Sequence, residues 1–173
     1  MITIFDAALM GDFELLMKMY KGDVNCINED TKLNLLQTIM CGDGNYEQRK
    51  AMVFFLIDEG IDINYQGGKH KRNALHILYS SLNIRDEEFI ITITNTLLEA
   101  GIDINQKDAF GAIPLSYLIS GKLGNGVVKS LLSVLKKYGV KCHEKDNYGN
   151  SCVDYANQFP WRKEIAEEMK NED

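Results

Sequence analysis

Long apolar segments and proline are scarce in this sequence of 173 residues. It contains two prolines and no low-complexity run, which argues against long disordered segments. No apolar run approaches the roughly 20 residues that a membrane-spanning helix needs. Residues 1–6 carry no positive side chain, and Asp6 and Asp12 interrupt any apolar stretch, so we expect no signal peptide.

An excess of basic residues is also missing. The formal net charge is −6 and the isoelectric point is about 5.1. Nucleic-acid binding needs a basic face, and anionic membrane surfaces attract basic segments. We therefore expect neither nucleic acid nor a membrane as a partner.

The sequence lacks paired cysteines. Cys26, Cys41, Cys142 and Cys152 form no C-x-x-C motif, and their spacing fits neither a disulfide framework nor a zinc site. We expect reduced, buried thiols, which favour a cytoplasmic location.

No catalytic signature is visible either. The glycine-rich segment 121–126 has no preceding strand and no G-K-[ST], so a turn between helices explains it better than a phosphate loop. His143 and Glu144 begin an H-E-x-x-H motif, but its fifth residue is Asn147. We expect no enzyme activity, no metal site and no cofactor.

What the sequence does contain is a phrase that it repeats. Residues 56–64 read LIDEGIDIN, residues 97–105 read LLEAGIDIN, and residues 135–142 read LKKYGVKC. The second copy begins 41 residues after the first, and the third begins 38 residues later. A period of this length indicates one supersecondary unit stacked on itself.

Helix-breaking residues and the spacing of apolar residues divide the unit after the second copy into a turn and two helices. Residues 106–111 form a turn, and Pro114 can open a short helix because its missing N–H has no helical partner there. Glycines at 121 and in Gly124–Gly126 break that helix, and a second helix is expected from about 127 to 138. Gly139 then ends the unit.

The same division applies along the whole chain. It predicts a single all-α domain over 1–173 with five helix–loop–helix units, at about 1–30, 31–68, 69–107, 108–145 and 146–173. Asp12 and Asp86 are expected to cap helices, and Leu82 is expected to line the short helix of the third unit. The last helix, from Pro160, ends in charged residues that include Glu172 and Asp173.

These units resemble the ankyrin repeat, a β-turn followed by two antiparallel helices with a T-P-L-H-x-A signature. The matching stretches are residues 73–78, 113–118 and 151–156, and the D-x-x-G turn is present at 108–111 and 146–149. The resemblance implies a solenoid with β-turn or hairpin connections, and a backbone-bonding role for His76.

The sequence also departs from that family. Its periods exceed the usual value of about 33, and the surplus lies between the paired helices, at 42–45, 80–86 and 121–126. The second unit lacks the D-x-x-G turn, and residues 67–72 replace it in the third. The enlarged edge is either functional or the result of neutral drift, which loops tolerate.

The resemblance implies that partners bind the concave face and the turn tips. The residues carried over by position are His70, Lys71, Arg72, Lys107, Ala109, Phe110, Ala112, Lys145, Asn147, Tyr148 and Asn150 at the tips, and Ser80, Ser120 and Gln158 on the short helices. Phe110 and Tyr148 are either interface anchors or rings that pack on the neighbouring tip. The basic tips suggest an acidic partner, or only alternating surface charge.

We therefore expect a non-catalytic, monomeric module that binds one partner protein. The chain is similar to stand-alone ankyrin proteins of low-GC bacteria, which leads to the hypothesis of an immunity protein that neutralises a toxin. The alternatives are an adaptor or assembly subunit, and a viral, phage or symbiont protein that intercepts a host regulator. The fold alone does not choose among them.

Overall fold

A computed structural model describes residues 2–84 and 86–170. Helices joined by turns and loops make up that part of the chain, which contains two isolated β-bridges and no strand. The predicted all-α class is confirmed. The charged end at Glu172 and Asp173 lies outside the described residues. The described helices form five pairs: α1 (Ile4–Met10) and α2 (Phe13–Met19), α3 (Leu35–Cys41) and α4 (Tyr46–Asp58), α5 (Ala74–Ser80) and α6 (Glu87–Glu99), α7 (Pro114–Ser120) and α8 (Asn125–Lys137), and α9 (Cys152–Gln158) and α10 (Lys163–Lys170).

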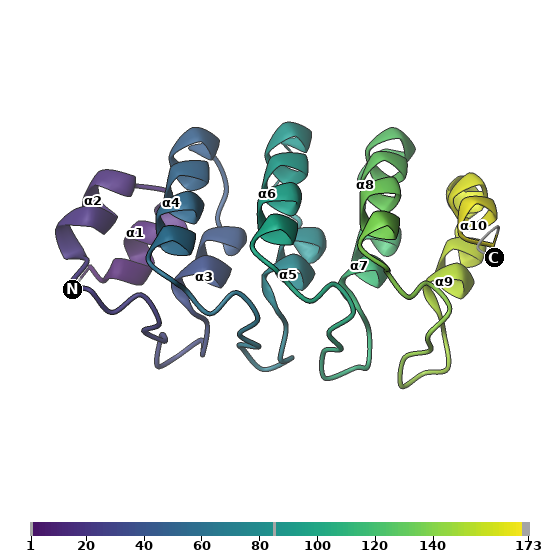
Figure 1. The fold of residues 1–173 in the computed structure, drawn as a ribbon, viewed down its shortest axis with the longest axis horizontal. Coiled ribbons are helices and arrows are strands. Elements are labelled where there is room, and N and C mark those ends of the chain that lie inside the picture. The colour runs from purple at the N-terminus through teal and green to yellow at the C-terminus, as the bar shows by residue number, and fades with distance from the viewer. Residues whose placement is uncertain (1, 85, 171–173) are drawn as a thin grey trace.

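The five pairs stand side by side in one row (Figure 1). Each short helix contacts the short helix of the next pair, from α1 to α9, and each long helix contacts the next long helix. The turns that join one pair to the next lie along one edge of the row, which is the lower edge in Figure 1. Side chains from every pair contribute to one continuous apolar core.

Most helix starts follow the predicted signals. The Asp12 carboxylate accepts a hydrogen bond from Leu15 N at 2.9 Å, and the Asp86 carboxylate accepts one from Phe89 N at 2.7 Å. Pro114 is the first residue of α7, where its missing N–H has no helical partner. The two aspartate caps are therefore confirmed.

Three details of the prediction are wrong. Asn125 and Gly126 do not break a helix: Gly124 is the N-cap of α8, and these two residues form its first turn. Leu82 lies beyond the end of α5, and its side chain is 69% exposed. Pro160 opens a 3₁₀ turn, Pro160–Arg162, before α10 begins.

The repeated phrase has a structural reason. The side chain of Asn64, which ends one copy, accepts a hydrogen bond from Asp103 N at 2.7 Å and donates one to the Gly101 carbonyl at 3.2 Å. Asn25 and Asn105 make the same two bonds to the corner of the following pair. These three residues form an asparagine ladder in which each phrase holds the next one in place.

The third copy of the phrase lacks this asparagine. His143 follows α8 of the fourth pair and occupies the position that asparagine holds in the two complete copies. The corner that follows α10 lies outside the described residues.

The environments of the cysteines and the lengths of the helices can be compared with what the sequence predicts. Cys142 and Cys152 are buried, Cys26 and Cys41 are half-buried, and none of the four forms a disulfide within the described residues. Burial raises the pKa of Cys152 to about 12, so this thiol stays protonated at neutral pH. In residues 2–84 and 86–170, no helix is both long and apolar enough to cross a bilayer.

Candidate functional site

The most regular surface of the molecule is the row of turns along one edge. We name them tip 2 (28–33), tip 3 (67–72), tip 4 (108–112) and tip 5 (146–150), after the helix pair that follows each. Ala109 N donates to the His70 carbonyl at 2.8 Å, and Asn147 N donates to the Phe110 carbonyl at 2.9 Å. A backbone bond of 3.1 Å from Gly68 N to the Lys32 carbonyl joins tips 2 and 3. The tips are therefore braced against one another.

A buried aspartate shapes tip 4. One Asp108 oxygen accepts hydrogen bonds from Phe110 N at 2.9 Å and Ala112 N at 3.1 Å, and the other accepts the Tyr117 hydroxyl at 2.6 Å. Asp146 holds tip 5 with the same set of bonds. The D-x-x-G turn thus depends on a carboxylate that is fixed from both sides.

These contacts shift the titration of the groups involved. Burial raises the pKa of Tyr117 and of Tyr155 to about 12, and the hydrogen bond of each to its aspartate adds to the effect. Burial alone would raise the pKa of Asp146, but hydrogen bonds from Tyr155 and the backbone lower it overall. Both tyrosines therefore stay protonated donors at neutral pH.

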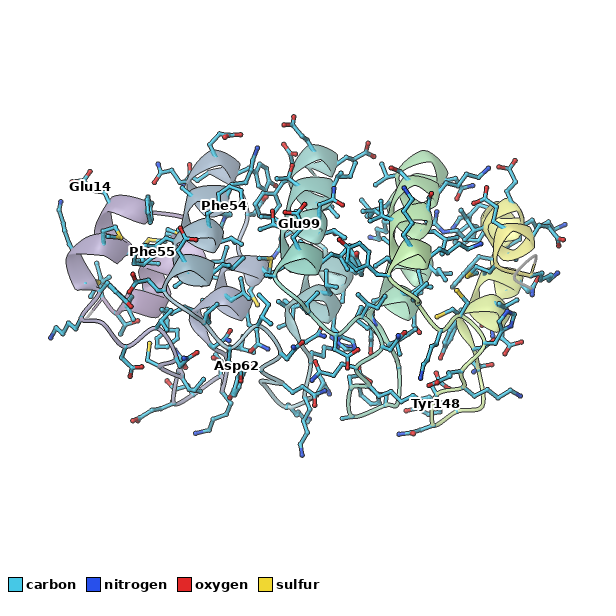
Figure 2. All side chains as sticks on the ribbon, viewed as in Figure 1. Glu14, Phe54, Phe55, Asp62, Glu99 and Tyr148 are labelled. Carbon is cyan, nitrogen blue, oxygen red and sulfur yellow. The ribbon has the colours of Figure 1, made fainter. Side chains whose placement is uncertain are left out.

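Three rings line up across successive tips. The ring of Phe110 lies 5.0 Å from that of His70 and 6.4 Å from that of Tyr148, measured between centroids. Phe110 is half-buried in this column, so the packing role predicted as one alternative holds for it. Tyr148, at the end of the column, is 70% exposed and lies on the lower edge in Figure 2.

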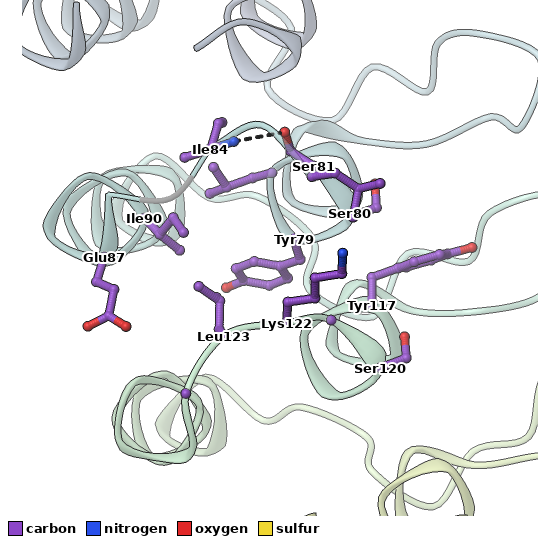
Figure 3. A pocket seen from close by; sticks show the side chains of 14 residues that line it. Tyr79, Ser80, Ser81, Ile84, Glu87, Ile90, Tyr117, Ser120, Lys122 and Leu123 are labelled. Carbon is purple, nitrogen blue, oxygen red and sulfur yellow. Dashed lines mark hydrogen bonds between the residues drawn. The ribbon is translucent and has the colours of Figure 1, made fainter. Parts of the chain in front are cut away.

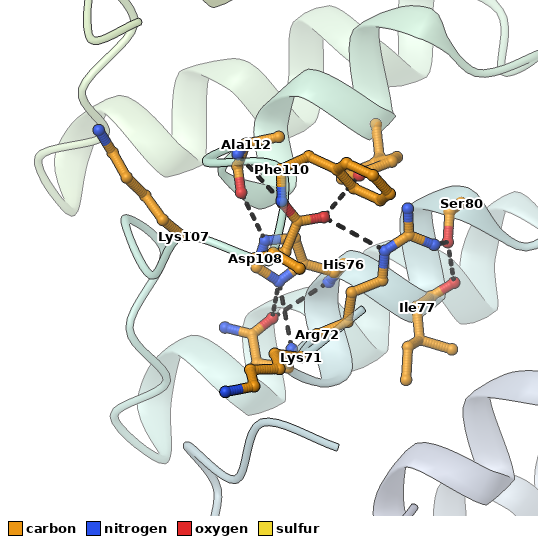
Figure 4. A network of polar contacts seen from close by, with 12 residues as sticks. Lys71, Arg72, His76, Ile77, Ser80, Lys107, Asp108, Phe110 and Ala112 are labelled. Atoms are coloured by element: carbon orange, nitrogen blue, oxygen red, sulfur yellow. Dashed lines mark hydrogen bonds and ion pairs between the residues drawn. The ribbon is translucent and has the colours of Figure 1, made fainter. Parts of the chain in front are cut away.

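Arg72 is turned inward rather than presented at the tip. Its guanidinium carbon lies 4.2 Å above the Tyr117 ring, and its Nε lies 3.4 Å from Asp108 (Figure 4). A third contact of 3.5 Å reaches the Ser80 hydroxyl. Arg72 therefore links the third and fourth helix pairs on the short-helix face.

His76 has the structural role that the resemblance implies. It is fully buried, its Nε2 lies 3.0 Å from the Ala112 carbonyl, and its Nδ1 lies 3.2 Å from Asn73 N. Burial lowers the pKa of His76, so the ring is neutral at pH 7. As Figure 4 shows, it joins tip 4 to the start of α5.

The sequence-predicted site residues occupy different environments. Lys71, Lys107, Ala109, Ser120, Lys145, Asn147, Tyr148 and Gln158 are exposed, and His70, Arg72, Ser80, Phe110 and Asn150 are half-buried. Ala112 is a correction, because only 6% of it is exposed. Its N–H and carbonyl are held by Asp108 and His76, which draws the residue into the interior.

Two cavities open on the short-helix face beside the tips. One, of about 300 Å³, lies between the fourth and fifth pairs and is lined by Phe110, Tyr117, Tyr148 and Tyr155 among others. The other, of about 460 Å³, lies between the second and third pairs. We name the second one the tip groove. Its apolar residues include Leu33, Met40, Ile77 and Leu82, and its basic ones are His70 and Arg72.

A third cavity lies on the other side of Leu82, between the loops that join short to long helices. Its volume is about 400 Å³, and Tyr79, Lys122 and Leu123 are among the residues around it (Figure 3). The loops that lengthen the repeats thus shape this hollow. Leu82 and its neighbours form a ridge between this cavity and the tip groove.

Basic side chains concentrate at tip 3. Its last four residues are Lys69, His70, Lys71 and Arg72. By contrast Lys107, which directly precedes tip 4, lies 3.3 Å from a Glu144 oxygen. Among the described residues, neither Lys69 nor Lys71 forms an ion pair. Tip 3 therefore carries positive charge that the protein does not neutralise, in a chain that is acidic as a whole.

Two lysines have an uncommon backbone conformation. Lys32 has φ 59° and Lys71 has φ 50°, and the equivalent positions in tips 4 and 5 are Gly111 with φ 75° and Gly149 with φ 82°. A left-handed conformation destabilises a residue with a Cβ by about 1 kcal/mol or more, whereas glycine adopts it freely. The tips on either side of the tip groove thus keep lysine where glycine would be more stable.

Sequence reasoning did not single out Lys32 or Met40, and it assigned Leu82 to the apolar stripe of a short helix. Lys32 aligns with Gly111 and Gly149 once the repeats are superposed, so its replacement of glycine was a usable signal. No signal marked Met40 or Leu82 as groove residues, because an apolar residue near a helix end is ordinarily counted as core.

No metal cluster is present in the described part of the chain, where no three His, Cys, Asp or Glu side chains gather. No family model matches the sequence. No curated protein matches it either.

Proposed function

We propose that this chain is a non-catalytic protein-binding module, an ankyrin-repeat solenoid that holds one partner against its tips and its short-helix face. The observation that carries the proposal is the braced row of tips. Hydrogen bonds from tip to tip fix the backbone, so side chains that project from it lose little further freedom when a partner binds.

The exposed ring of Tyr148 and the two cavities support this choice of face. Tyrosine is enriched among residues that dominate binding energy, and a 70% exposed ring at the end of a rigid column is placed to act as an anchor. The short helices and tips of adjacent pairs together line the hollows beside it. Binding at this face requires no movement of the helices.

A pull-down from the source cell tests the proposal, with bound proteins identified by mass spectrometry. Tyr148→Ala removes the exposed ring, and Tyr138→Ala is the matched control because Tyr138 is 50% exposed at the end of α8. We expect one stoichiometric partner with wild type and the control, and at least a tenfold loss with Tyr148→Ala, the effect of about 1.4 kcal/mol.

The identity of the captured protein then gives the biological role. A toxin as the single partner would make the chain an immunity protein, and a set of subunits would make it an adaptor or assembly subunit. A host regulator would place it among intercepting proteins. Recovery of no stoichiometric partner, or equal recovery with Tyr148→Ala, would contradict the proposal for this face.

A further inference from the structure

The tip groove has the shape of a site for a short apolar segment. Leu33, Met40 and Ile77 line it, and the 69% exposed Leu82 stands at its rim. Its volume of about 460 Å³ is large enough to receive side chains from outside. An exposed leucine beside an open apolar hollow favours contact with another apolar group.

Basic residue types border the groove. His70 and Arg72 line it, with Arg72 paired to Asp108, and no acidic residue is among its described lining residues. Lys69 and Lys71 are exposed on the same tip. Glu29 and Asp30 on tip 2 are exposed and, like these lysines, lie outside the groove lining. The unpaired lysines of tip 3 complement negative charge on a partner.

The left-handed lysines are an observation independent of the groove. Lys32 immediately precedes Leu33, and Lys71 stands between His70 and Arg72, so each adjoins a residue that lines the groove. Tips 4 and 5, whose turns are one residue shorter, use glycine at the corresponding left-handed position. A left-handed position does not require lysine, and a side chain kept there at the expense of stability points to use of its charge.

We propose that the tip groove binds an acidic linear segment of the partner protein, with an apolar side chain seated between Leu33, Ile77 and Leu82. Carboxylates of the segment lie along tips 2 and 3 and pair with Lys32, Lys69 and Lys71. This inference rests on the proposed function and adds to it the place and the chemistry of the partner.

Fluorescence anisotropy with a defined probe tests this inference. The probe is a short fluorescein-labelled peptide in which glutamates flank two leucines, and the comparison peptide has lysine in place of glutamate. The key variant is Lys32→Gly with Lys71→Gly, because it removes both charges and also relieves both left-handed lysines. Its melting temperature should equal or exceed that of wild type, so a loss of binding cannot come from unfolding.

The matched control is Lys137→Gln with Lys163→Gln, which changes the net charge equally at exposed sites in α8 and α10. We expect the acidic peptide to bind wild type and the control alike, and the lysine peptide to bind neither. Loss of two exposed ion pairs should weaken binding to Lys32→Gly/Lys71→Gly by about 2- to 30-fold. Leu82→Ser should weaken it several-fold.

Three results would overturn the inference: unchanged binding by Lys32→Gly/Lys71→Gly, equal binding of the lysine peptide, or equal binding of a single-stranded oligonucleotide of matched charge. These differ from a failure of the proposed function. If a cellular partner is captured and lost with Tyr148→Ala, but the acidic peptide does not bind the groove, only this inference fails. If the peptide binds but no partner is captured, the proposed function fails.

Discussion

Two arginines show how single residues hold this chain together. Arg49 is fully buried, and each of its five N–H groups donates to a backbone carbonyl. The acceptors are the carbonyls of Ala8, Leu9, Ile39, Asp43 and Gly44. The last carbonyls of a helix have no partner within it, so Arg49 satisfies those at the ends of α1 and α3. Arg162 makes a similar set of bonds beyond α7.

We predict that Arg49→Met lowers the free energy of unfolding by about 3 kcal/mol or more, because several buried carbonyls lose their donor. Urea denaturation followed by circular dichroism measures the change. Lys18→Met is the control: Lys18 is exposed on α2 and pairs only with Glu14, so its loss should stay within about 0.5 kcal/mol. A loss below 1 kcal/mol for Arg49→Met would mean that water replaces the guanidinium.

Buried polar residues differ in how far their roles can be predicted from the sequence. His76 was predictable, because its place in a repeated motif implied a bond to the backbone, and the structure has that bond. Arg49 was not, since an arginine in a long helix ordinarily faces water. The Arg49 side chain becomes buried only because the ends of α1 and α3 and the loop before α4 meet around it. The inward turn of Arg72 was hidden in the same way.

At the scale of elements, asparagine links each pair of helices to the next. The ladder of Asn25, Asn64 and Asn105 ties corners that are 34 to 39 residues apart in the sequence. These bonds join asparagine side chains to backbone groups that have no helical partner. The repeated phrase is thus a coupling device between neighbouring units, and not only a record of duplication.

Substitution of Asn64 should weaken that coupling. We predict that Asn64→Ala reduces the free energy of unfolding by about 1–2 kcal/mol, through the loss of two hydrogen bonds to the next corner. His143→Ala, at the equivalent position after the fourth pair, changes an exposed side chain and should alter this free energy by less than about 0.5 kcal/mol. Thermal and urea denaturation of both variants measure the difference. Equal effects of the two substitutions would refute the ladder as a source of stability.

The helices themselves were largely predictable from sequence, because capping residues and apolar periodicity are local signals. Asp12, Asp86 and Pro114 each mark a helix start where the structure has one. The error at Gly124–Gly126 arose because glycine was read as a breaker, although the first turn of a helix needs no internal donors. The tip groove was not predictable, since it depends on how neighbouring pairs meet.

At the scale of the whole molecule, the stability of each helix pair depends on its contacts with the neighbouring pairs in the row. Helices contact those of adjacent pairs, so a central pair is supported on both sides and a terminal pair on one. In such linear arrays the stability is close to a sum of unit terms and interface terms. Contacts are mostly local along the chain, which favours rapid folding from more than one starting point.

Native-state hydrogen exchange should reveal this arrangement. We predict that backbone amides in α5 to α8 are the most protected, and that those in α1, α2 and α10 exchange at least about tenfold faster, because terminal pairs open without disturbing the centre. Ile165→Ala, which removes a fully buried side chain from α10, should speed exchange in α9 and α10 and leave α5 and α6 unchanged. If exchange rises equally in every helix, the molecule unfolds as a single cooperative unit, and binding at the tip groove would then stabilise the distant α10 as strongly as the nearby α5.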